Sequence, residues 1–117
     1  MATQQGASSG FWTRAVPVGT FYGNEPVQPS LDVQDDFGLK CFVTGNAVTT
    51  NPDNDDVDNG TVTLISPQMD LSTYNDPYLY YSRWFADESV SGNTPDDYMS
   101  IKMSNGSGTF VIENVTT

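Results

Sequence analysis

The chain contains no histidine, one cysteine and four basic residues, and each shortage excludes a class of function. Without histidine, no imidazole can take the proton of a Ser or Cys nucleophile, and the usual zinc ligand set cannot be assembled. Four Lys and Arg residues against 15 Asp and Glu residues give a formal net charge of −11. Because nucleic acids and anionic membranes are bound mainly through Lys and Arg, we expect neither as a partner, and cations are favoured instead.

Long apolar runs are also missing. No stretch approaches the roughly 18 residues of a transmembrane helix, so no membrane span is expected. The amino terminus lacks the basic-then-apolar pattern of a signal peptide, and any export signal is expected to lie outside the sequence or to have been removed. Cys41 has no cysteine partner, and its strand-like setting predicts a buried, unreactive thiol. No spacing singles out a catalytic carboxylate pair among the acids, so we expect the chain not to be an enzyme.

What remains is the composition of one β-rich domain. The 117 residues are 37% hydrophobic and 12% aromatic, which is enough to fold and to bury a modest core. Residues 1–10 are small and polar and are expected to form a disordered leader, whereas residues 11–117 form a single domain. No stretch shows a helical apolar repeat. Turn residues instead bound six expected strands, at residues 11–16, 37–44, 61–65, 78–85, 98–103 and 109–115.

These strands predict an all-β, antiparallel β-sandwich. The clearest hairpin signal is Ser-Asn-Gly-Ser-Gly at 104–108, between the last two strands. Residues 21–36 carry two prolines and little periodicity, and they are expected to form an irregular connection.

The segment 78–85 is the most apolar of the expected strands. Large side chains fall on both of its faces, which predicts a central strand with Tyr80 and Trp84 in the core. The alternative is that exposed rings stack on sugars, because aromatic faces offer the same apolar contact to a glycan. The candidate carbohydrate-binding residues are Tyr74, Tyr78 and Trp84.

An acidic loop precedes the strand at 61–65. Asp53, Asp55, Asp56 and Asp58 lie within six residues of one another, and the turn pair Asn-Gly follows at 59–60. Carboxylates so close together repel one another unless they face water or share a cation. The loop is therefore either a solvated surface or part of a site for a hard metal ion such as calcium.

Four segments, in this order, resemble a MAM-like jelly-roll domain, an accessory domain of secreted bacterial proteins. They are Trp-Thr-Arg-Ala-Val-Pro-Val-Gly-Thr at 12–20, Cys-Phe-Val-Thr-Gly-Asn at 41–46, Asp-Val-Asp-Asn-Gly-Thr-Val-Thr-Leu-Ile-Ser-Pro at 56–67 with Asp-Leu-Ser at 70–72, and Tyr-Ser-Arg-Trp-Phe at 81–85. The resemblance covers about residues 11 to 115.

The resemblance implies a two-sheet jelly roll that binds or spaces rather than cleaves, in an extracellular or cell-surface protein with an adhesive role. It also implies a structural calcium ion. Asp56 and Asp58 match the motif, Asp55 lies beside it, and Asp36 and Asp97 are candidates by their expected proximity.

Domains of this kind have further strands at both ends, so the resemblance implies a partial jelly roll. A sandwich lacking strands leaves a sheet edge and part of its core uncovered. We therefore expect either self-association or a partner chain that donates strands. The ligand class implied by the resemblance is a protein or a glycan.

Overall fold

The computed structural model describes residues 1–47, 49, 52, 56–87 and 97–116. Within these residues the secondary structure is entirely β, with no α-helix. The strands are β1 (Ala2–Gln5), β2 (Trp12–Ala15), β3 (Thr20–Tyr22), β4 (Glu25–Gln28), β5 (Cys41–Thr44), β6 (Val62–Ile65), β7 (Met99–Ser104) and β8 (Thr109–Val115). None of the described residues belongs to a helix long and apolar enough to cross a membrane.

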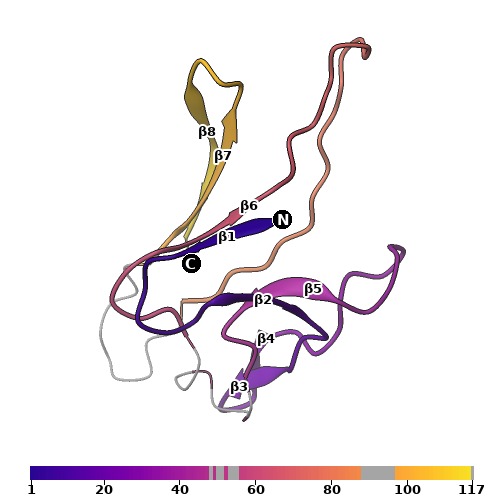
Figure 1. Ribbon diagram of the computed structural model, residues 1–117. Helices are drawn as coiled ribbons and strands as arrows, with labels where there is room; N and C mark the ends of the chain where they lie inside the picture. Colours follow the sequence, from indigo (N-terminus) through magenta and orange to yellow (C-terminus); the bar gives the residue numbers. More distant parts are fainter. Residues whose placement is uncertain (48, 50–51, 53–55, 88–96, 117) are drawn as a thin grey trace.

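All of the described strands pair antiparallel, in four separate two-stranded sheets: β1 with β6, β2 with β5, β3 with β4, and β7 with β8. The sheets β1–β6 and β2–β5 lie next to each other at the centre of the molecule, where β2 contacts β6 (Figure 1). The β3–β4 hairpin lies at one end, and the β7–β8 hairpin projects toward the other (Figure 1). The all-β, antiparallel prediction is thus confirmed, whereas the described sheets do not close into a jelly-roll sandwich.

Four of the six expected strands form close to where turn chemistry places them. These are β2, β6, β7 and β8, and Ser104–Thr109 is the last register pair before the predicted turn. The expected strand at 37–44 is paired only over β5. In the turn at 105–108, Asn105 Oδ1 accepts hydrogen bonds from the backbone N–H groups of Ser107 and Gly108, both at 3.1 Å. Local side-chain bonding of this kind explains why the sequence signal is strong there.

Two predictions of irregular structure need correction. Residues 2–5, expected to be part of a disordered leader, form β1, whose register runs from Ala2 opposite Ile65 to Gln5 opposite Val62. Residues 20–28, at the start of the expected irregular connection, form the β3–β4 hairpin around a turn at Gly23, whose φ is 61°. A positive φ suits glycine, which has no Cβ to clash.

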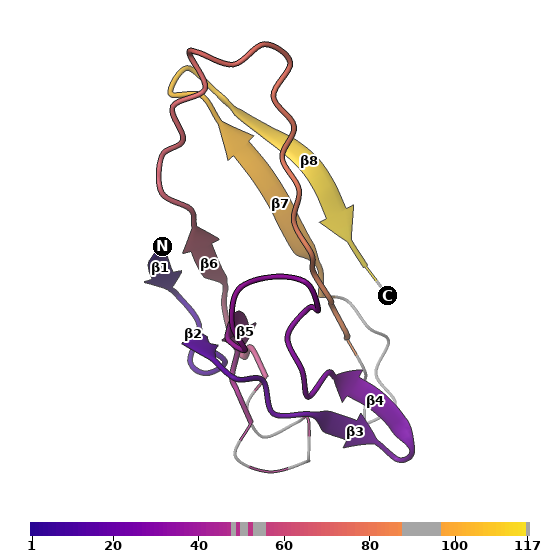
Figure 2. The same cartoon turned by 90° about the vertical axis from the view of Figure 1, so that its right-hand side faces the viewer.

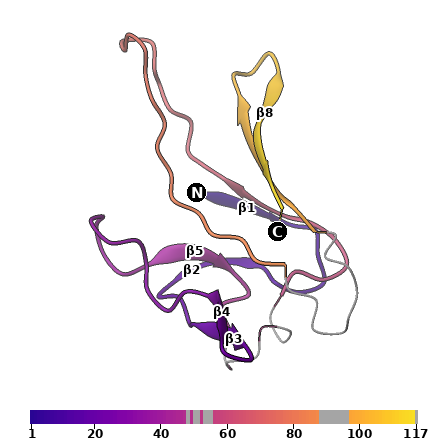
Figure 3. The ribbon, with the colours of Figure 1, turned by 180° about the vertical axis from the view of Figure 1, so that it is seen from behind.

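The largest difference from the sequence prediction concerns residues 78–85, which form no strand. Residues 66–80 instead make an extended arm that leaves the end of β6, turns, and runs back toward the body (Figures 1 and 2). At its tip, Tyr74 N donates to Leu71 O at 3.1 Å and Ser72 N donates to Asp70 Oδ1 at 3.0 Å. The arm and the β7–β8 hairpin project in the same direction, as the view from behind also shows (Figure 3).

Few side chains are buried. Among the described residues, the buried apolar side chains are Pro17, Val43, which is 2% exposed, Ala47 and Val115. The accessible surface is 8929 Å², whereas a compact monomer of this mass exposes about 6300 Å². The radius of gyration is 15.7 Å, against about 13.4 Å for a compact chain of this length. The fold therefore exposes apolar surface that a closed sandwich would bury.

Candidate functional site

The acidic loop packs against the segment that joins β1 to β2. Ser8 N donates to Asp58 O at 2.8 Å, and Ser9 Oγ lies 2.9 Å from Asp56 O and 3.1 Å from Asp58 Oδ2. The Gly10 backbone is so close to this loop that a Cβ added to it would lie 2.4 Å from Asp56 O. The segment after β1 therefore positions Asp56 and Asp58, which the sequence did not indicate.

The predicted calcium ligands are only partly assembled. Asp56 and Asp58 are both exposed at the loop surface, and Asp55 lies outside the described residues. Asp36 lies in the separate loop between β4 and β5, and Asp97 N donates to Asp87 Oδ2 at 2.9 Å in another part of the chain. No three Asp, Glu or Cys side chains of the described residues are placed to share a metal ion. Calcium takes roughly six to eight oxygen ligands, and the described residues do not assemble such a shell; calcium binding stays a prediction.

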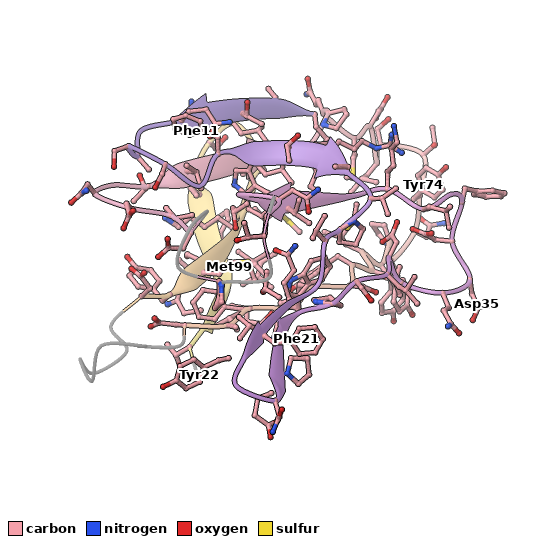
Figure 4. All side chains as sticks on the ribbon, turned by 90° about the horizontal axis from the view of Figure 1, so that it is seen from below. Phe11, Phe21, Tyr22, Asp35, Tyr74 and Met99 are labelled. Carbon is pink, nitrogen blue, oxygen red and sulfur yellow. The ribbon has the colours of Figure 1, made fainter. Side chains whose placement is uncertain are left out.

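The three candidate carbohydrate-binding residues occupy one continuous stretch of chain but not one surface. Tyr74 lies in the turn of the arm and is 65% exposed, and Tyr78 is 83% exposed. Trp84 is half-buried, and six residues of extended chain place it about 20 Å from Tyr78. In the view from below, Tyr74 lies well apart from Phe21 and Tyr22 of β3, which project from opposite sides of their hairpin (Figure 4). Of the three candidates, only Tyr74 and Tyr78 are exposed on the arm.

Burial corrects the packing predicted for the aromatic segment. Tyr80, expected in the core, is 88% exposed, and Trp84 is only half-buried. Cys41, expected to be buried, is half-buried. Burial, followed by the nearby negative charge of Asp32, raises the pKa of the Cys41 thiol. A raised pKa keeps the thiol protonated at neutral pH, which agrees with the predicted lack of reactivity.

A polar cluster ties the chain beyond the arm to β8. Tyr81 Oη donates to Glu113 Oε2 at 3.1 Å, Arg83 Nε donates to the same oxygen at 3.4 Å, and Arg83 Nη2 pairs with Glu113 Oε1. The hydrogen bond from Arg83 lowers the pKa of Glu113, and the bond from Tyr81 adds to this effect. Desolvation, followed by the hydrogen bond to Glu113, raises the pKa of Tyr81. Both shifts point away from neutrality, so the cluster suits anchoring the segment rather than proton transfer.

A second hydrogen-bond centre joins the two halves of the body. Asn46 Oδ1 accepts from Val18 N at 2.8 Å, and Asn46 Nδ2 donates to Val16 O at 3.0 Å. Gln28 Nε2 reaches Val18 O at 2.6 Å and lies 3.4 Å from Asn46 Oδ1. This single half-buried amide therefore fixes the link between β2 and β3 against the end of β5. The sequence indicates Asn46 as a turn residue only.

Residues 81–86 continue in the same extended conformation as the arm. Among the described residues, no backbone hydrogen bond involves residues 77–86, although the chain is extended there and carries Tyr78, Leu79, Tyr80 and Tyr81 at the surface. Such a segment has the side chains of a strand without a partner strand. Its N–H and C=O groups have no backbone partner among the described residues.

Comparison with known proteins found no matching family model, no matching curated protein and no matching solved structure.

Proposed function

We propose that this chain is a non-catalytic binding or spacing module of an exported protein, and that strands from another polypeptide complete its β-structure. The observation that carries the proposal is the surface of about 8900 Å², roughly 2600 Å² more than a compact monomer of this mass exposes. Permanent complexes bury roughly 2,000–5,000 Å² in total, which is about 1,000–2,500 Å² on each partner, so the excess on this chain matches the upper end of what an obligate partner covers.

The exposed side chains are of the kind that partners bury. Residues 77–86 expose Tyr78, Leu79, Tyr80 and Tyr81, and Phe110, Val111 and Ile112 of β8 are also exposed. Each large apolar side chain left in water forgoes roughly 1.5–3 kcal/mol of stabilisation. Two or three such side chains therefore represent a large part of the roughly 5–15 kcal/mol that stabilises a typical domain.

A non-catalytic role fits the polar groups that are present. The chain has no histidine, and Glu113 is held ionised by Arg83 and Tyr81 rather than tuned toward neutral pH. Export is supported by the resemblance to accessory domains of secreted proteins. Completion of a jelly-roll sandwich by the added strands is the architecture that this resemblance favours.

The test is the solution behaviour of the isolated chain. We expect size-exclusion chromatography with light scattering to show a mass that rises with concentration, or else an expanded monomer that binds the apolar dye ANS. A compact, dye-silent monomer that unfolds cooperatively at every concentration would refute the proposal, because it would show that these strands bury their own core.

A second function, carbohydrate binding, is favoured by one observation, the exposure of Tyr74 and Tyr78 on the arm. Exposed rings stack on sugar faces, whereas buried ones cannot. We expect glycan-array binding, if this function holds, to be lost in a Tyr74→Ala, Tyr78→Ala double variant. A Tyr22→Ala variant is the matched control, because Tyr22 is exposed on the β3–β4 hairpin. An array without any bound glycan contradicts this second function.

A further inference from the structure

We propose that residues 77–86, named here the acceptor segment, bind one extended strand of a basic polypeptide, with apolar side chains in the middle of that strand and Lys or Arg near both of its ends. This inference rests on the proposed function and names its partner. It follows from three properties of the segment: an unpaired backbone, exposed aromatic side chains and the charges that flank it.

The backbone sets the shape of the partner. Residues 77–86 are extended and, among the described residues, make no backbone hydrogen bond. An extended chain in this state can satisfy its N–H and C=O groups by pairing with a strand along its whole length. Tyr78 and Tyr80 are exposed by 83% and 88%, so no described part of the chain covers these two rings. A partner strand with β-branched or aliphatic residues would pack against these rings.

The charges select a basic partner over a second copy of the chain. Asp76 precedes the acceptor segment and Asp87 follows it, while Arg83, the base within it, is already paired with Glu113. A partner strand therefore meets negative charge at both ends and no free positive charge between them. Two copies of a chain with a net charge of −11 repel each other. Lys or Arg at the two ends of a donated strand removes this repulsion and pairs with both carboxylates.

The spacing of the two acids fixes the probe. Asp76 and Asp87 are 11 positions apart, so a twelve-residue peptide with Lys at both ends and five Val-Thr repeats between them matches the segment in either strand direction. We would measure binding of the fluorescently labelled peptide to the full chain by anisotropy. The control peptides carry Glu at both ends, or N-methyl groups on alternate residues that remove the donors of one edge. We expect the Lys-flanked peptide to bind, the Glu-flanked peptide to bind at least tenfold more weakly, and the N-methylated peptide not to bind.

Variants of the chain locate the site. Asp76→Asn with Asp87→Asn removes the two flanking charges, and exposed ion pairs of this kind correspond to about a three- to tenfold loss of affinity. The matched control is Asp35→Asn with Asp36→Asn, which changes the net charge equally in a different loop. Tyr80→Pro removes an N–H that is unpaired among the described residues and should abolish binding. Tyr80→Ala, which keeps the N–H, should only weaken it.

Three results would overturn the inference. The first is equal binding of Lys- and Glu-flanked peptides, and the second is an equal effect of the two Asp→Asn pairs. The third is self-association that strengthens with added salt and is abolished by Tyr80→Pro. This result would show that a second copy of the chain, and not a basic polypeptide, binds the acceptor segment. All three leave the proposed function standing, since that fails only if the chain alone is a compact, cooperative monomer. Such a monomer that still binds the Lys-flanked peptide would refute the proposed function and keep this inference.

Discussion

Replacement of Asn46 by alanine should destabilise the body of the molecule. The substitution removes the acceptor for Val18 N at 2.8 Å and the donor to Val16 O at 3.0 Å. Each such bond contributes about 0.5–1.5 kcal/mol net. The free energy of unfolding should therefore fall by about 2 kcal/mol, without counting the weaker 3.4 Å contact between Asn46 and Gln28.

The assay is urea denaturation, supported by thermal melts, at a fixed protein concentration. A loss of about 2 kcal/mol lowers the Tm of a domain of this size by roughly 10 °C. Asn46→Asp separates the two bonds, because the carboxylate keeps an acceptor for Val18 N but loses the donor to Val16 O. We expect Asn46→Asp to lose about 1 kcal/mol, half the effect of the alanine variant.

The control is Asn75→Ala, since Asn75 is an exposed residue at the tip of the arm. Changes at such surface positions usually stay within about 0.5 kcal/mol of the parent. If Asn46→Ala and Asn75→Ala unfold at the same urea concentration, the amide does not join β2, β3 and β5, and the reasoning from the hydrogen-bond geometry is refuted.

Three further predictions test other parts of the molecule. Calcium at a hundredfold excess over its dissociation constant should stabilise the fold by about 2.7 kcal/mol, and an Asp56→Ala, Asp58→Ala variant should lose this shift; equal melting temperatures in chelator and in millimolar calcium contradict the site. Gly10→Ala should destabilise the fold by about 1–3 kcal/mol in urea titrations, because φ is +67° at this position and the new Cβ would clash with Asp56 O. An unchanged midpoint of urea unfolding would show that the acidic loop moves to accommodate the methyl group. The pKa of Glu113 is lowered in the folded state, so ionised Glu113 contributes fully to stability above its unfolded pKa, and this contribution is lost as the pH falls through the folded value. Glu113→Gln should therefore make stability depend less on pH below about pH 4.5. An unchanged pH dependence in the variant would show that Glu113 does not contribute in this way.

The local turns were predictable from the sequence, because their chemistry lies in adjacent residues. The turn between β7 and β8 is held by the Asn105 side chain, which bonds two and three residues ahead. The β3–β4 hairpin has a local turn signal in Gly23-Asn24 after the β-prone run Thr20–Tyr22, but Pro26 in the second arm argues against a strand there.

The remaining features depend on partners distant in sequence. β1 has hardly any apolar character and forms through backbone pairing with β6, so neither composition nor periodicity indicates it. Asn46 bonds to residues 28 and 30 positions away, which no local pattern shows. The segment 78–85 has the residues of a central strand but no partner strand among the described residues, and intrinsic β-propensity cannot form a strand alone. For the predicted metal site, the sequence placed Asp56 and Asp58 in one loop but not the serines that contact them.

The pairing of β1 with β6 has a consequence for how the chain folds. Residues 6–61 must close into a loop before Gln5 meets Val62, whereas only residues 105–108 separate β7 from β8. By the logarithmic dependence of closure entropy on length, the longer loop costs about 2 kcal/mol more. Isolated hairpins form in roughly 1–10 μs, so β7–β8 can be in place before the first residues of the chain find β6. Any polypeptide that carries a strand complementary to β6 can compete for it during this interval, and the amino-terminal segment is therefore open to exchange with a neighbouring chain during refolding.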